Sequence, residues 1–534
     1  MTGALMVPKV LGADVELGNF VLGGPVSGSG AEASRALLAA FAEVTGAVGP
    51  PDDESATRGH INPQDRGRRF LPSNGGGAYI DLDHLELTLG EQPCGRDFVA
   101  AWHGMLALAQ QALHRANEGR TEGRYQALVN NSDGRGNSYG GHLNLLVSRR
   151  AWTDVLERKP HLLAAVASYH AASMVVTGQG KVGSENNAPP ARFELSQRAN
   201  FTEALAGPQT TYRRPLCNTR DESHSVPATA RLHVICYDSG LAPVGTLLKV
   251  GGLQVLMAAV EAGAAPRDLA LEDPVEAVQR WSADPLFQTR CPLIDGRDVT
   301  AVELMGMFGD RLARFVDIED LADIVPGAGE IMAVWGSTID LLERGDWSGA
   351  ARRLDWALKL GMIERALSRR PELDWDSPAV KHLDHLYSSL DPNDGWYWAL
   401  ERAGAVERVV SPAEVERAAA EPSPSTRAWA RAMLLRRAPA GTVAEVDWDH
   451  IRFRLGHPHG LGQRWRVDLP SPLHGTRAEC GSAFAETQDF EELLREIGGV
   501  VEPEPAMRSW WSTGQSGRGL TWGYHREGGE YRYE

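Results

Sequence analysis

The chain has 534 residues, of which 43% are hydrophobic and 23% are charged, and its net charge is −16. This composition is that of a globular protein, and the acidic balance argues against nucleic-acid binding. The five scattered cysteines fit a reducing cytoplasm and have no CxxC or zinc-ribbon spacing. We see no signal peptide, and we expect no apolar run of the ~18–20 residues that a membrane span requires.

The first predicted elements are a strand in residues 1–20 and a helix near residues 32–44. The segment Gly49–Arg69 is rich in Pro, Gly and charge, so it offers little apolar surface to bury, and we expect a mobile loop there. A strand at 78–82 follows. The further predicted helices lie at 98–115, 161–176 and 248–262, before a mostly helical region at 265–435.

Composition divides the C-terminal part of the chain after the Pro- and Ser-containing segment at 421–428. We predict a catalytic domain over residues 1–435, a small α/β domain over 445–502 and a Trp-rich tail over 503–534. Tryptophan rings are costly to leave in water, so we expect the tail to dock, either on this chain or in a homodimer contact.

Polar side chains recur two residues apart in the predicted strands, which places each pair on one face of a sheet. The sets are Asp14 with Glu16, His142 with Asn144, Arg231 with His233, and Asn218 with Arg220 and Glu222. Asp81 ends a strand and Glu86 follows it, so a bend near Leu82–His84 is required if both serve one site. A single pair is most simply a solvated strand face, but the recurrence of acids, imidazoles and guanidinium groups favours a site.

Carboxylates and imidazoles on one sheet face suit a hard cation such as Mg²⁺, and neighbouring arginines suit phosphate. A metal, arginines and a lone carboxylate together are typical of phosphoryl transfer. Other motifs are weaker: GQGKVG at 178–183 follows a predicted helix rather than a strand, and no P-loop sequence occurs. His382 and His385 are most simply the solvated face of a helix.

Six stretches in residues 10–250 carry a resemblance to a known family: GADVELG, NGGGAYID, NNSDGRGNSYGGH, LSQR, NTRDESH and RLHVI. Together they resemble the Pup ligase and Pup deamidase/depupylase family, carboxylate–amine ligase relatives of glutamine synthetase. The resemblance implies an α+β fold, with a curved antiparallel sheet that cradles ATP and Mg²⁺, helices behind it and a small C-terminal domain. It also implies an ATP-dependent cytoplasmic enzyme that forms or hydrolyses an amide at a glutamyl side chain of Pup or a Pup-like protein.

The resemblance further implies roles for individual residues. Asp81 falls at the position of the catalytic aspartate. The implied metal-binding positions are Asp14, Glu16, Glu86 and His233, and the implied nucleotide-binding positions are His142, Asn144, Arg198, Asn218, Arg220 and Arg231. The long stretch between Glu16 and Asn74 favours the deamidase branch.

Departures from the family pattern keep other functions open. Asp14 stands for a glutamate, His84–Leu87 reads His-Leu-Glu-Leu for His-Pro-Glu-Tyr, Leu143 stands for a glutamate, and Ala242–Thr246 replaces an acidic run. These changes remove carboxyl and hydroxyl groups near the site. The alternatives are a small-molecule carboxylate–amine ligase, with a small carboxylate as substrate, and a nucleotide-binding homologue that has lost turnover.

Overall fold

The structure is a computed structural model, and it describes residues 6–24, 28–49, 67–456 and 462–502. Most of the expected loop at Gly49–Arg69 and the whole tail at 503–534 lie outside the described residues. The mobile loop and the docking of the tail, including its homodimer contact, therefore stay predictions.

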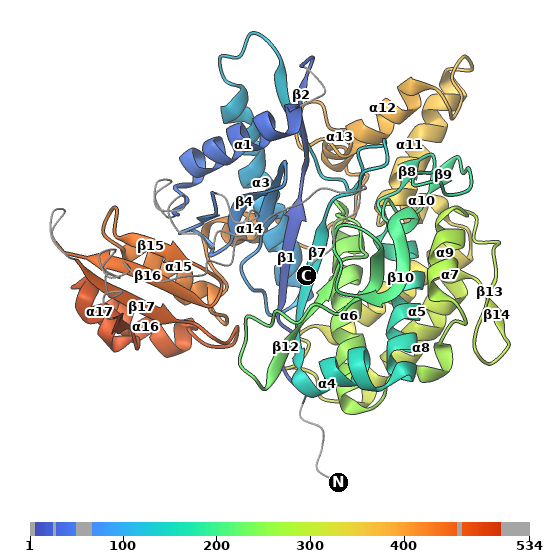
Figure 1. Cartoon of the computed structure of the whole chain (residues 1–534). Coiled ribbons are helices and arrows are strands. Elements are labelled where there is room, and N and C mark those ends of the chain that lie inside the picture. The colour runs from blue at the N-terminus through green and yellow to red at the C-terminus, as the bar shows by residue number, and fades with distance from the viewer. Residues whose placement is uncertain (1–5, 25–27, 50–66, 457–461, 503–534) are drawn as a thin grey trace, which may run out of the picture.

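Six antiparallel strands form the main sheet, in the order β12-β7-β1-β5-β4-β3 (Figure 1). They are β1 (Leu11–Glu16), β3 (Arg69–Phe70), β4 (Gly77–Asp81), β5 (His84–Thr88), β7 (Gly141–Ser148) and β12 (Thr229–Val234). The single strand expected in residues 1–20 is two strands, because the chain leaves the sheet at Leu17. It continues as β2 (Gly18–Leu22), which pairs with β6 (Arg124–Leu128). The predicted α+β class is confirmed.

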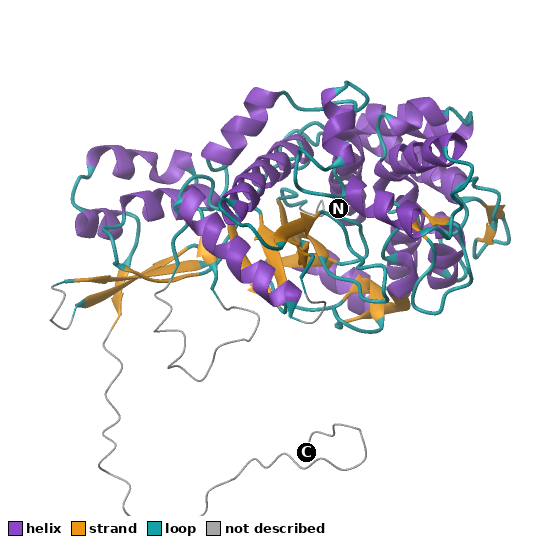
Figure 2. Cartoon of the chain, turned by 90° about the horizontal axis from the view of Figure 1, so that it is seen from above, coloured by secondary structure: helices purple, strands orange, loops and turns teal. Residues whose placement is uncertain are grey.

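Helices α1 (Ser29–Thr45), α3 (Gly95–Asn117) and α6 (Pro243–Ala262) contact strands of this sheet. Along β1, Leu11, Ala13 and Val15 alternate with other residues and belong to the main hydrophobic core. Because successive strand side chains point to opposite faces, the residues between these three point to the other side of the sheet. Seen from above, most helices lie on one side of the strands (Figure 2). The sheet therefore has one face that packs against helices and one polar face.

Helix α6 is the one helix among the described residues that is long and apolar enough to cross a membrane by length and composition alone. It has 20 residues with a mean hydropathy of 1.5 in its most apolar window, and 94% of that window is buried inside the protein. A helix that is surrounded by other elements is apolar on every side, because no face of it meets water. Its N-terminus lies further upstream than predicted, at Pro243, where proline is suited to the first turn.

The predicted helices at 32–44, 98–115 and 161–176 are confirmed as α1, α3 and α5, and each is longer than expected. The elements between β7 and β12 are α4 (Arg149–Thr153), α5 (Pro160–Thr177), β8 (Lys181–Val182), β9 (Phe193–Glu194), β10 (Thr202–Gly207) and β11 (Arg214–Asn218). The helical region that follows α6 comprises α7 (Pro274–Ser282), α8 (Ala301–Ile318), α9 (Ala328–Glu343), α10 (Trp347–Ala351), α11 (Asp355–Arg369), α12 (Pro378–Tyr387), α13 (Trp396–Arg402) and α14 (Pro412–Ala420), with a short hairpin of β13 (Cys291–Pro292) and β14 (Asp298–Val299).

A second hydrophobic core lies in the C-terminal unit. Its four-stranded sheet consists of β15 (Val443–Val446), β16 (His450–Leu455), β17 (Gln463–Asp468) and β18 (Val500–Glu502), packed with α15 (Ala428–Arg437), α16 (Arg477–Glu486) and α17 (Phe490–Glu496). A buried ion-pair group joins this unit to the chain after β5. The carboxylate of Glu91 accepts hydrogen bonds from Arg427 Nε at 2.6 Å and from Arg431 Nη2 at 2.5 Å.

Candidate active site

The polar pairs of β1, β5 and β7 meet on the face of the sheet opposite the hydrophobic core. Glu16 lies opposite Glu86, and Asp14 lies opposite His142 in the strand registers. His233 of β12 lies opposite Asn144 of β7, which extends the polar face by one more strand. Strand alternation, which the sequence showed, places the side chains on this face, and the register aligns them across it.

Asp81 reaches the same face through a hairpin turn. Leu82 adopts a φ of +51°, and the chain reverses so that Asp81 pairs with His84 and Tyr79 pairs with Glu86. A left-handed residue is suited to a tight two-residue turn, which matches the twist of the two strands. The expected bend near Leu82–His84 is therefore confirmed, and it is a strand reversal.

Glu16, Asp81 and Glu86 form a compact group, with one ligand atom of each lying within 4.8 Å of the others. Burial raises the pKa of Glu16, and burial together with the charges of Asp14 and Glu16 raises the pKa of Glu86 well above its usual value. Oε2 of Glu86 is buried and has no hydrogen-bond partner among the described residues. Closely spaced carboxylates of this kind are suited to a divalent cation, which would relieve their repulsion.

Asn144 orients the side chains next to this group. Its Nδ2 donates to Asp14 at 2.7 Å, and its Oδ1 lies 2.9 Å from His233 Nδ1 and accepts from Arg231 Nη1 at 3.3 Å. The rings of His142 and His233 lie 4.9 Å apart, and burial, followed by the charge of Arg198, lowers the pKa of His142 to about 3. Burial, followed by the charges of His142 and Arg231, also lowers the pKa of His233 well below its usual value, so both imidazoles are neutral at pH 7. Asp14, which accepts a hydrogen bond from Asn144, is not one of the three carboxylates of the compact group, although its charge acts on Glu86.

The placement of Asn218, Arg220 and Glu222 on one strand face is wrong. Strand β11 ends at Asn218 and pairs with β10 in a separate sheet, so the other two residues lie in the loop before β12. The strand ends there because the Asn218 side chain accepts the backbone N–H of Arg220 at 2.9 Å, a typical turn-forming contact. Glu222 lies 3.3 Å from Arg231 and 3.8 Å from Arg220, so the loop still brings Arg220 to the end of the site face.

Two further arginines approach the site from other segments. Arg198 is 1% exposed, and its Nη1 donates to the carbonyl oxygen of Tyr139. Arg214, which the search for same-face pairs missed, donates through Nη2 to the carbonyl oxygen of Ser138 at 2.6 Å. Burial and the charge of Arg198 lower the pKa of Arg214 to about 10, so it remains cationic. The sequence signal that could have identified Arg214 was its position at the start of β11, shortly before the NTRDESH motif.

Leu143, which stands for a glutamate of the family pattern, does not point toward the site. Leu143 lies opposite Ala13, is 2% exposed and belongs to the hydrophobic core. Leu85 and Leu87 of β5 are buried in the same core, so the side chains that differ there also point away from the polar face. The argument for lost turnover from Leu143 therefore fails, since a side chain at that position does not face the carboxylates.

Two hollows adjoin the polar face. One, of about 560 Å³, is lined by Asp14, Asn144 and Arg231 together with Arg427 and Trp448 of the C-terminal part of the chain. The other is wider, about 2040 Å³, and its lining residues include Asn19, His84, Arg135, Tyr139, His382 and His385. His84 pairs with Asp81, so the wide hollow adjoins the strand end that bears this aspartate.

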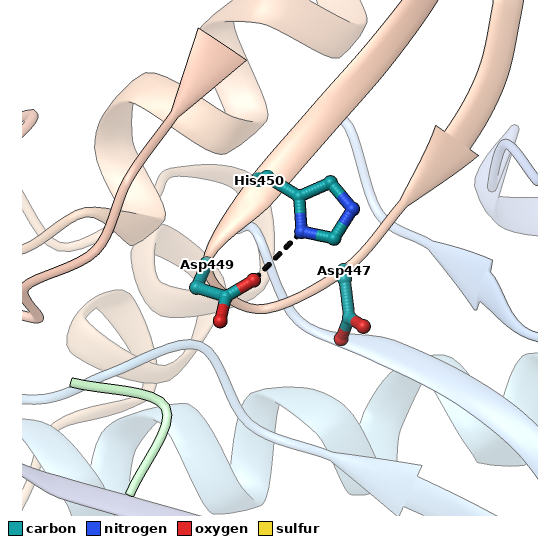
Figure 3. Close-up of side chains that lie close together, drawn as sticks. All are labelled: Asp447, Asp449 and His450. Atoms are coloured by element: carbon teal, nitrogen blue, oxygen red, sulfur yellow. Dashed lines mark hydrogen bonds and ion pairs between the residues drawn. The ribbon is translucent and has the colours of Figure 1, made fainter. Parts of the chain in front are cut away.

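A second group of possible ligands, Asp447, Asp449 and His450, lies in the C-terminal unit (Figure 3). His450 Nδ1 lies 2.7 Å from Asp449, and hydrogen bonds with Asp449 and then Glu445 raise the pKa of His450 to about 9. Without a metal, the protonated imidazole pairs with Asp449, and Asp447 pairs with Arg68 at 3.2 Å. Asp449 also lies 3.9 Å from His224 of the loop before β12, so this group links that loop to the C-terminal unit.

The antiparallel sheet backed by helices, with acids and arginines on its free face, defines an α+β fold with a charged ligand site. Residues 22–452 match the family model described as Pup-ligase protein, and the chain belongs to this family.

The chain is 34% identical over 431 residues to the Pup deamidase/depupylase of Mycolicibacterium smegmatis, which covers 80% of this chain and 83% of the relative. It is 35% identical over 395 residues to the Pup–protein ligase of Xylanimonas cellulosilytica, which covers 71% of this chain and 83% of the relative. Among solved structures, the ligase PafA in complex with the prokaryotic ubiquitin-like protein Pup shares the fold, with a TM-score of 0.74, 21% identity and 92% of each chain covered.

Proposed function

We propose that this chain is an ATP- and Mg²⁺-dependent enzyme that acts on a glutamyl side-chain carboxylate or amide of Pup or a Pup-like protein. The relatives named above act on Pup. The observation that carries the proposal is the group Glu16, Asp81 and Glu86, whose ligand atoms lie within 4.8 Å of one another beside arginines on an open sheet face. The five free cysteines suit action in the cytoplasm.

The smaller hollow is suited to the nucleotide. Its walls combine apolar side chains with a few charged ones, as is usual for small-molecule sites. Arg231 lines it, and the side chain of Arg220 lies near Glu222 at the same end, so both guanidinium groups can reach phosphate oxygens. Trp448 also lines the hollow and is an aromatic side chain that can contact the base.

The carboxylates of Glu16 and Glu86 are suited to hold Mg²⁺, because both are buried and Glu86 Oε2 has no partner among the residues that the structure describes. His233 Nε2 is likewise buried without a described partner, on the side of Asn144. When bound, the cation would neutralise negative charge on the nucleotide phosphates. The two glutamates would then hold the cation in place while the arginines bind the phosphate oxygens.

Asp81 is the residue best placed to act on the substrate. It is half-buried, whereas Glu16 and Glu86 are buried, and it ends β4 next to the wide hollow. A carboxylate there can attack a glutamyl carbonyl carbon or take a proton from an attacking water or amine. The hollow is open to solvent, so a polypeptide end can approach it. We propose that the end of Pup approaches Asp81 from this side.

The direction of the reaction is tested with Pup that ends in glutamine and with a Pup–protein conjugate. We expect conversion of the terminal amide to the acid and release of the conjugated protein, both requiring ATP and Mg²⁺, as seen by mass spectrometry and gel electrophoresis. Formation of new conjugates on lysine-bearing proteins would place the chain with the ligases. Turnover of ATP with a small carboxylate and an amine, but not with Pup, would contradict the proposal.

Replacing Glu86 tests the metal site. Because the folded protein raises the pKa of Glu86 above its usual 4.5, the ionised carboxylate costs stability above that pH when no cation is bound. We expect Glu86→Gln to raise the melting temperature of the metal-free protein at pH 7, by a gain on the order of 1 kcal/mol, and to abolish further stabilisation by Mg²⁺. Calorimetric melting with and without Mg²⁺ measures both effects. The exposed Asp83 nearby provides the control, since Asp83→Asn should leave the Mg²⁺ effect intact.

A further inference from the structure

Asp238, which follows β12, holds the turn that carries Arg198. It is 1% exposed, and its carboxylate accepts the backbone N–H groups of Gln179 at 2.8 Å, Gln197 at 2.9 Å and Arg198 at 3.3 Å. It also accepts the hydroxyl of Ser196 at 2.9 Å. One carboxylate thus fixes three consecutive residues of the turn and ties them to the end of α5.

Asp238 places a charged side chain at a buried position, where a neutral side chain would cost less free energy to desolvate. Four neutral donors bind the carboxylate of Asp238 directly, while the positive charges of Arg198 and Lys249 act on it without forming an ion pair with it among the described residues. A buried carboxylate is costly to desolvate, and its donors must be well aligned to offset that cost. The result is a rigid turn at one position of the site.

The guanidinium group of Arg198 is held by one hydrogen bond, and one of its edges has no hydrogen-bond partner among the described residues. Nη1 donates to the carbonyl oxygen of Tyr139, whereas Nε and Nη2 are buried and have no hydrogen-bond partner among the described residues. The Nε–Nη2 edge presents two parallel N–H groups, which match two oxygens of one carboxylate or phosphoryl group. The Tyr139 carbonyl that Nη1 binds adjoins Gly140, whose carbonyl oxygen accepts the backbone N–H of Glu16 at 3.1 Å, so this edge lies close to the catalytic face.

We propose that Asp238 is a positioning residue, which aims the Nε–Nη2 edge of Arg198 at one anionic group of the reactants. That group is either a phosphoryl group of the nucleotide or the carboxylate of the protein substrate. The inference rests on the proposed function for the identity of the reactants, and on the hydrogen bonds above for the roles of Asp238 and Arg198.

A double-mutant cycle tests the proposal. Asp238→Asn keeps the shape of the side chain, but one of its two terminal atoms becomes an NH₂ donor, which cannot accept the backbone N–H of Gln179 and Gln197 or, in the other orientation, that of Arg198. We expect Asp238→Asn and Arg198→Gln each to lower kcat about tenfold or more, and the double variant to be within about twofold of Arg198→Gln. A merely structural carboxylate would give independent effects that multiply, and that result would overturn the proposal.

Asp355 is the matched control. It is also buried, at 4% exposed, and it accepts the backbone N–H groups of Leu241 and Ala242, but it holds the start of α6 rather than the turn of Arg198. The effect of Asp355→Asn should therefore multiply with that of Arg198→Gln. If Asp238→Asn does not fold, Ser196→Ala removes a single donor and should show a smaller loss that again disappears in the Arg198→Gln background.

Calorimetric binding of ATP with Mg²⁺ shows whether the Arg198 edge binds a phosphoryl group or the substrate carboxylate. It also tests the role of Asp238 separately from the proposed function. Weaker nucleotide binding in both Asp238→Asn and Arg198→Gln assigns the edge to a phosphoryl group. Unchanged nucleotide binding with a lower kcat assigns it to the substrate carboxylate. If the wild-type protein binds ATP but does not act on Pup, the proposed function fails. In that case the double-mutant cycle is measured on the Kd for ATP. If the free-energy effects of Asp238→Asn and Arg198→Gln on this Kd are additive, the positioning role of Asp238 is overturned.

Discussion

Asp81→Asn abolishes turnover, with an expected loss of about 10³-fold or more in kcat, while ATP and Mg²⁺ still bind. An amide cannot act as a nucleophile or accept a proton at this position, because its lone pairs are far less basic than those of a carboxylate. The amide oxygen remains available as a neutral ligand on the side of Glu16 and Glu86. Nucleotide binding should therefore change far less than kcat.

Asp83→Asn is the matched control for Asp81→Asn, since Asp83 lies in the same hairpin turn and is exposed. Its activity should stay within about twofold of the wild type. Activity is measured as release of ammonia or of the conjugated protein, and binding is measured by calorimetry. Full activity of Asp81→Asn would remove Asp81 from the mechanism, and loss of ATP binding would assign it to the metal site instead.

Glu91→Gln has the largest expected effect on stability, a loss of about 3–5 kcal/mol in the free energy of unfolding. The side chains of Arg427 and Arg431 are 5% and 0% exposed, so the substitution leaves two buried guanidinium groups without their counter-ion. Chemical denaturation at pH 7 measures the loss. Glu276→Gln removes the exposed partner of Arg280, and it should cost less than about 0.5 kcal/mol.

The contribution of Glu91 depends on pH in a defined direction. Although burial raises it, the charges of Arg431 and Arg427 lower the pKa of Glu91 to about 2, from a usual value of 4.5. The stabilisation is therefore present in full above pH 4.5 and is lost as the pH falls from there toward 2. The difference in stability between wild type and Glu91→Gln should shrink over this range. A difference that stays constant down to pH 2.5 would contradict the pairing.

The polar face of β1 and β7 could be predicted from the sequence. The pairs Asp14 with Glu16 and His142 with Asn144 follow from strand alternation alone, which is a local property of the backbone. The family motifs gave the fold class, and the structure and the family match confirm it. The prediction that Asn218 and Arg220 lie in one strand was wrong. The alternation of residue types along the sequence does not reveal that the Asn218 side chain ends the strand.

Only the tertiary structure decided how the separate segments complete the site. The hairpin at Leu82 brings Asp81 beside Glu16, and the long-range packing of the turn held by Asp238 brings in Arg198. The strand register also turned Leu143 toward the core, so a departure that suggested lost activity lies on the other face. These features depend on contacts between residues far apart in the chain. Such contacts are set by the packing of whole elements, and sequence periodicity does not specify them.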